Sequence, residues 1–270
     1  MKKVLLASLL ALSASVALAN PATDKKTQAE FAKIEKMISE KDFTQAHAAL
    51  DKMAKQGNAQ AIYNLAFLAQ TGQGTRKDEK RARQLYQLAA KKGYPVASYV
   101  LAKHYMAGTL GFEQDLVKAK QLLEQASNSK FNDATIEYAV LLFSENDPKS
   151  DQAALKRLAP LIKAENPQAI HAKAIYELSA GFRNQNTDTI KSGLDSIQGL
   201  AKKGYIPALM AMGNMLVNGK LVEQDLVEAK KIFTALAEGN IPQAKESLAV
   251  VDKLIAEQAA KAQPALTGQS

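Results

Sequence analysis

The sequence predicts an all-α fold in which helical hairpins stack side by side as a solenoid, and two sets of repeated positions predict it. The first set is a small residue at Ala61, Ala97, Ala134, Ala169, Ala208 and Ala244. The second set drifts by the same steps of 36, 37, 35, 39 and 36, at Ala46, Ala82, Ala119, Ala154, Gly193 and Ala229. Because two independent sets of positions advance along the chain by the same varying steps, the chain repeats a structural unit.

Residues 57–93 show what one unit contains. Ala61 and Leu65 begin an apolar stripe with a spacing of three to four residues, which is typical of one helix face. The glycine-containing segment 71–75 breaks this helix, and Asp78 is a predicted N-cap for a second helix. One unit is therefore a helix, a turn and a second helix.

Helix contact explains why small residues recur. Axes that pack 8–10 Å apart leave no room for a large side chain where they cross. Five residues after each first-helix alanine comes another small residue, at Ala66, Ala102, Ala139, Ala174, Gly213 and Ala249. We expect the repeated small and apolar residues to pack against each other, and a linker at 181–187 to absorb the longest step, 39.

Three segments carry the full pattern. Residues 57–92 contain Ala61, Leu65, Gly72-Gln73-Gly74, Asp78, Ala82 and Leu85-Tyr86. Residues 93–128 contain Ala97, Leu101-Ala102, Gly108, Asp115 and Ala119, and residues 204–239 contain Ala208, Gly213, Gly219, Asp225 and Ala229. These segments resemble Sel1-like repeats, which are similar to tetratricopeptide repeats, and residues 131–203 resemble degenerate copies. The resemblance implies about six hairpins with capping helices and a protein–protein scaffold whose motif has no catalytic residue.

The first residues predict export. Residues 1–19 have a basic start at Lys2-Lys3, an apolar core at 4–12 and small residues before a cleavage site after Ala19. The apolar core is too short to span a bilayer, and no cysteine is present to carry a lipid anchor. We expect a signal peptide and a periplasmic location. The remaining segments are a polar leader at 20–26, the solenoid at 27–262 and a flexible tail at 263–270.

No residue pattern indicates an enzyme or a cofactor. The three histidines, His47, His104 and His171, are isolated from one another and lack metal-ligand spacing. No Gly-x-Ser-x-Gly motif is present, and no predicted strand precedes Gly72-Gln73-Gly74. The sequence therefore predicts no catalytic, metal or cofactor site and no identifiable small-molecule substrate. The methionines Met210, Met212 and Met215 could line an adaptable groove, but their spread over more than one helix face favours core packing.

One charged segment is a candidate partner-binding patch, and it contains Arg76, Lys77, Lys80, Arg81 and Arg83. Residues 76–92 carry a local net charge of +5. Three of the cations, at 76, 80 and 83, would share a face if the helix began near Arg76. The patch is either a solvated outer surface or a site that attracts an acidic partner or an anionic membrane. Nucleic acid is not expected, because the chain is predicted to be exported and its basic residues lack interleaved aromatic side chains.

The leading functional hypothesis is a periplasmic module that binds a protein partner on a concave surface lined by the first helices. By analogy with the family, that partner is an envelope complex or a secreted effector that the chain neutralises. One alternative is a cell-wall or β-lactam hydrolase, an activity attributed to some exported relatives, although no nucleophile–base pair supports it. A second alternative is an adaptor that links two envelope proteins.

Overall fold

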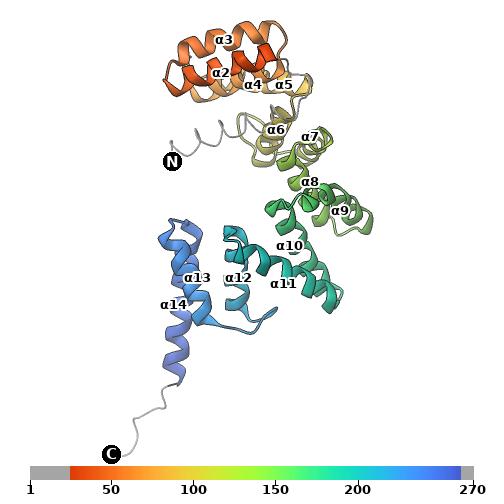
Figure 1. Cartoon of the computed structure of the whole chain (residues 1–270), viewed down its shortest axis with the longest axis vertical. Helices are drawn as coiled ribbons and strands as arrows, with labels where there is room; N and C mark the ends of the chain where they lie inside the picture. The colour runs from red at the N-terminus through yellow and green to blue at the C-terminus, as the bar shows by residue number, and fades with distance from the viewer. Residues whose placement is uncertain (1–24, 263–270) are drawn as a thin grey trace, which may run out of the picture. The chain divides into compact units, whose positions relative to one another are not determined.

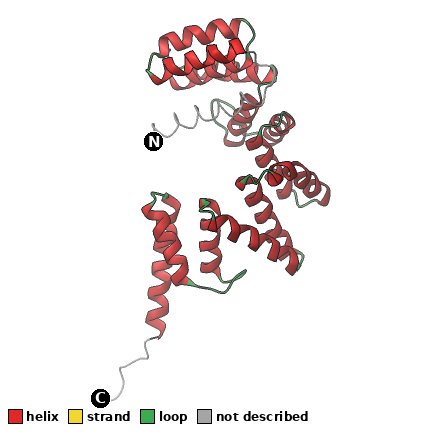
Figure 2. Ribbon diagram, viewed as in Figure 1, coloured by secondary structure: helices red, strands yellow, loops and turns green. Residues whose placement is uncertain are grey.

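The computed structural model describes residues 25–262, which contain thirteen helices and no strand (Figures 1 and 2). The helices follow in pairs: α2 (Lys25–Ser39) and α3 (Phe43–Lys55), α4 (Ala59–Thr71) and α5 (Glu79–Lys91), α6 (Pro95–Ala107) and α7 (Leu116–Asn128), α8 (Asn132–Ser144) and α9 (Pro148–Lys163), α10 (Pro167–Arg183) and α11 (Thr187–Lys202), α12 (Ile206–Asn218) and α13 (Leu226–Glu238). A single helix, α14 (Pro242–Ala262), follows them. The all-α solenoid is confirmed. The predicted signal peptide and tail lie outside the described residues.

The described helices form two compact units that divide after Arg157, inside α9. Within the first unit, each helix from α2 to α8 contacts the next along the chain, and α10 to α14 do the same in the second unit. Contacts between sequence neighbours are what a stack of repeats requires. No helix within residues 25–262 is long and apolar enough to cross a membrane.

The recurring small residues lie where the helices pack. The six first-helix alanines and the five second-helix alanines have no exposed surface, and Gly193 is buried with them. The positions five residues later are buried from Ala66 to Gly213. The prediction is wrong for Ala249, which is exposed. In the preceding hairpin the equivalent Gly213 faces Phe233 of the second helix, whereas no helix follows α14 among the described residues.

Repeated turn residues set the length of the helices in the three full repeats. Aspartates begin the second helices, where their side chains accept a hydrogen bond from the backbone N–H three residues later at 2.8–2.9 Å: Asp78, Asp115 and Asp225. Glycines end the first helices in the left-handed conformation, with φ of 74°, 62° and 64°: Gly72, Gly108 and Gly219. These positions need φ above zero, which glycine adopts at no steric cost. The predicted N-cap and helix break are thus present in the structure.

Helix α10 departs from the prediction of a linker at 181–187. The helix continues through Arg183 and has 17 residues, whereas α4, α6, α8 and α12 have 13 each. The extra residues of the longest step therefore form an additional helical turn. Only residues 184–186 remain between α10 and α11.

The spacing between hairpins is constant. Fifteen residues separate each second-helix small residue from the next first-helix alanine, as from Ala82 to Ala97 and from Gly193 to Ala208. All variation in repeat length therefore lies within hairpins, between the first helix and the second. The number of residues that connects one hairpin to the next is therefore the same in every repeat.

Candidate functional site

The predicted basic patch lies at the start of α5 in the first unit. The helix begins at Glu79, so Arg76 and Lys77 belong to the preceding loop. Arg76, Lys80 and Arg83 could share a helix face only if the helix began near Arg76, and it does not. The ammonium group of Lys77 lies 2.6 Å from the carboxylate of Glu79. The side chains at 76, 80 and 81 are exposed.

Arg83 has a structural contact of its own. Its guanidinium donates a hydrogen bond of 2.6 Å to the carbonyl oxygen of Gly111 and lies 5.6 Å from the ring centroid of Phe112. Both partners are in the loop between α6 and α7. Arg83 thus fastens one hairpin to the next. The use of the patch for a partner stays a prediction, with Arg76, Lys80 and Arg81 as its exposed cations.

The outward surfaces of first helices α6 and α8 are joined in the first unit. The ammonium of Lys103 lies 2.9 Å from the carboxylate of Glu137, and the hydroxyl of Tyr99 donates to the same oxygen at 2.8 Å. Next to this network, Val140 is 48% exposed on α8. Helices α6 and α8 therefore present charged and apolar side chains side by side on the first unit.

The histidines pack individually. His104 Nδ1 lies 2.8 Å from the hydroxyl of Thr109, and the ring of His171 packs edge-on against Tyr205 at 5.7 Å. Burial lowers the pKa of His104 and of His171, and for His171 a hydrogen bond with the backbone of Pro207 opposes the shift. No group of three or more metal-ligating side chains is found in the described part of the chain.

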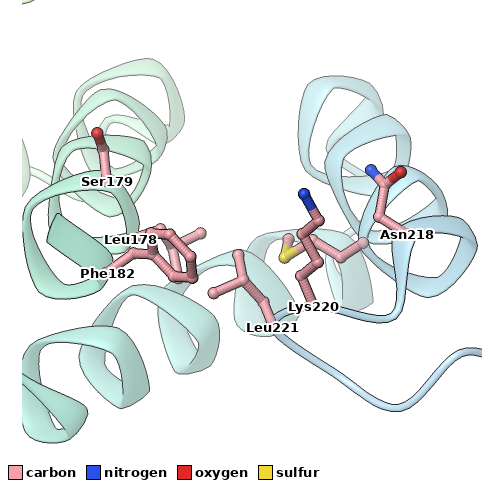
Figure 3. Close-up of a pocket in the computed structure, with 7 residues that line it drawn as sticks. Leu178, Ser179, Phe182, Asn218, Lys220 and Leu221 are labelled. Carbon is pink, nitrogen blue, oxygen red and sulfur yellow. The ribbon is translucent and has the colours of Figure 1, made fainter. Parts of the chain in front are cut away.

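A cavity of about 310 Å³ opens between the first helices α10 and α12 in the second unit (Figure 3). Its apolar lining is formed by Leu178, Phe182, Met215 and Leu221. Its polar lining is formed by Ser179, Asn218 and Lys220. Phe182 belongs to the additional turn of α10 and is 61% exposed. The cavity is thus an apolar depression with a polar edge on the surface of the first helices.

This cavity could not be predicted while Gly181 was assigned to a linker. Gly181 is buried inside α10, where an added Cβ atom would lie 2.8 Å from Ile190 Cγ1 and 2.9 Å from the Ile190 backbone nitrogen. The glycine permits α11 to approach and does not end the helix. The available signal was the spacing of four between Leu178 and Phe182, which continues the apolar stripe.

The comparisons with known proteins agree with this architecture. The Sel1 repeat family matches residues 59–94, 95–130 and 206–240. The chain contains three Sel1 repeats. Each match begins two residues after the start of a predicted full copy. The crystal structure of a Sel1 repeat protein from Oxalobacter formigenes covers 81% of this chain and 86% of its own, with a TM-score of 0.65 and 20% identity, and shows the same fold.

Two further relatives match the Sel1-like chain. The crystal structure of c5321, a protective antigen of uropathogenic Escherichia coli strains, aligns with 76% of this chain and 51% of its own, at 21% identity and a TM-score of 0.45. Chitin synthase regulatory factor 3 of Schizosaccharomyces pombe is 25% identical over 161 residues, or 57% of this chain. The Sel1-like chain spans 17% of the length of that curated relative.

Proposed function

We propose that this Sel1-like protein binds a protein partner on the surface of its first helices and catalyses no reaction. Sel1 repeats typically form non-catalytic scaffolds for protein interaction. The observation that carries the proposal is the cavity between α10 and α12, with exposed Phe182 at its edge. Binding energy at protein interfaces concentrates in large apolar side chains that fill such depressions.

A regulatory role through binding has support from one relative. Chitin synthase regulatory factor 3 is named as a regulator, and the region of similarity is confined to 17% of its length. A stack of repeats is a module that such a larger protein can contain. We therefore propose that this chain regulates or neutralises its partner by occupying a surface of it.

The proposed location is the bacterial periplasm. The support is the basic start, apolar core and small residues of the segment 1–19. Intact-mass measurement on the native protein should find a chain that begins at Asn20. A native protein that retains Met1 would contradict both the cleavage and the proposed location.

Site-specific photocrosslinking in cells tests the binding surface. A photoreactive residue should replace Val140, Ile175 or Phe182 on first helices, with Leu88 and Val227 on second helices as controls. All five positions carry exposed apolar side chains. The test and control positions therefore differ in whether they lie on a first or a second helix, and not in whether they are accessible. We expect a stoichiometric protein adduct from the first-helix positions and much less from the controls.

The identity and pattern of the adducts separate the alternatives. One partner, an envelope component or a secreted effector, supports a binding module. Two partners bridged by the same chain indicate an adaptor. Equal adducts from first and second helices would contradict the proposed surface.

A further inference from the structure

We propose that the cavity between α10 and α12 is an anchor site for a protein segment that inserts one large apolar side chain and places a carboxylate against Lys220. This inference rests on the proposed function and specifies the chemistry of the partner. It concerns the second unit alone.

The apolar part of the site is built for an inserted side chain. Leu178 and Met215 belong to the core cluster of the second unit and are 6% and 9% exposed. Leu221 is half-buried against the same cluster, and Phe182 is largely exposed. A volume of about 310 Å³ is at the lower end of the range for ligand sites, about 300–1,000 Å³. The cavity is therefore large enough to accept one inserted side chain.

The polar edge determines the charge of the occupant. In Figure 3, the polar groups of Lys220 and Asn218 lie on the α12 side of the cavity, and the hydroxyl of Ser179 lies on the α10 side, across the apolar side chains. The residues that line the cavity include one cation and no carboxylate. An ammonium with an amide on the same side of the cavity can donate several hydrogen bonds to one carboxylate. Charge complementarity therefore favours an acidic group next to the apolar anchor.

The exposed phenylalanine of the site comes from a feature of α10. Phe182 is present at the cavity because α10 has an additional turn, and the other 13-residue first helices have no such extension. The buried Gly181 lets α11 pack against this turn, since any Cβ there would lie within 3.0 Å of Ile190. The close packing fixes the turn that carries Phe182. The anchor is thus a local feature that the repeat motif does not encode.

Two small probes test the chemistry on the full mature chain. The probes are 4-phenylbutyrate and 4-phenylbutan-1-ol, which share the apolar group and differ in charge. Methyl-labelled methionine NMR should show saturable shifts of the Met215 signal, assigned with Met215→Leu. Because Lys220 is exposed, we expect the carboxylate to bind about two- to fivefold tighter than the alcohol, as an ion pair at an exposed site gives.

Matched variants decide the role of each part. Lys220→Gln should make the two probes equal, whereas Lys202→Gln, an exposed lysine of the same unit outside the cavity, should preserve the preference. Phe182→Ala should weaken both probes. An unshifted Met215 signal, or a preference that survives Lys220→Gln, would overturn the proposal.

Photocrosslinking distinguishes failure of the anchor from failure of the proposed function. If the anchor is correct, Phe182→Ser should strongly reduce the adduct formed at Ile175. If Phe182→Ser leaves the adducts at Val140 and Ile175 unchanged, the anchor is refuted while the binding surface stands. If neither position forms an adduct in the unaltered chain, the proposed function itself fails.

Discussion

At the scale of single residues, one hairpin contains a pair of residues whose sizes compensate. Gly213 occupies the position of Ala66 and Ala102, and the ring of Phe233 fills the space beside it. An added Cβ at Gly213 would lie 2.6 Å from Phe233 Cζ, and Phe233 is fully buried. In this hairpin the second helix supplies the volume that the first helix lacks.

Two glycine substitutions should therefore change stability in opposite directions. Gly213→Ala should lower the free energy of unfolding by up to about 2 kcal/mol, because overpacking exceeds the gain in helix propensity. Gly199→Ala, with nothing within 4 Å of the added Cβ in helix α11, should raise it by about 0.5–1 kcal/mol. Denaturant titration of both variants measures this. Equal signs would contradict the packing described for Gly213.

Ala102 tests the predicted helix crossing in the first unit. It has no exposed surface, so Ala102→Leu should destabilise the chain by about 1–3 kcal/mol. Ala102→Arg should cost more, because it also buries a charge. Ala48→Leu, at an exposed position of α3, is the control and should melt like the unaltered protein. A wild-type melting curve for either Ala102 variant would mean that the crossing is elsewhere.

At the scale of elements, the sequence predicted those features that one residue type determines locally. Asp78 and Gly72 act through their own backbone and side chain, so their roles could be recognised from sequence. Gly181 could not be assigned in this way, because the approach of α11 offsets the cost of about 1 kcal/mol that glycine imposes on a helix. The cavity beside it was missed for the same reason. Arg83 was likewise ambiguous, since its partners at Gly111 and Phe112 are 28 and 29 positions later.

Charge reversal at the start of α5 should change the rate of association with a partner without changing the stability of the fold. Arg76→Glu, Lys80→Glu and Arg81→Glu together should slow association with an acidic partner and flatten its salt dependence, because surface charge mainly accelerates encounter. The melting curve should change little, since exposed charges contribute little to stability. Surface plasmon resonance against the crosslinked partner measures the association rate at low and at high salt.

Two comparisons make this result specific. The same reversal at Lys191, Lys202 and Lys245, all exposed in the second unit, keeps the total charge change and should leave the association rate nearer that of the unaltered protein. Arg83→Glu should instead lower the melting temperature, because it removes the hydrogen bond to Gly111. An unchanged on-rate in the first triple variant would assign the patch to a solvated surface.

At the scale of the whole molecule, each unit contains one histidine whose pKa is lowered by burial, His104 in the first and His171 in the second. The folded chain therefore binds fewer protons at these sites than the unfolded chain does near pH 6. Under these conditions the free energy of unfolding rises with pH. The two histidines make their full contribution to the free energy of unfolding above the ordinary histidine pKa of 6.5. This contribution is lost as the pH falls towards the lowered pKa values of the folded state.

Denaturant titrations between pH 5 and 8 should accordingly show stability that decreases below about pH 6.5. His104→Gln and His171→Gln together should reduce this slope. The carboxylates whose pKa is lowered, Asp51, Glu79 and Glu145, titrate below this window. Burial raises the pKa of Asp133, which acts on the slope in the opposite direction and is the same in both proteins. A slope that the double variant leaves unchanged would contradict the assignment to these histidines.

The constant fifteen-residue step between hairpins has a consequence for how such a chain can change. Only the number of residues between the first and second helix of a hairpin varies. Residues can therefore be gained or lost at the tip of a hairpin while the connections between neighbouring hairpins keep their length. The additional turn of α10 is one such gain, and it brought Phe182 to the rim of a cavity. The tips are therefore where a new binding specificity can arise without disturbing the rest of the stack.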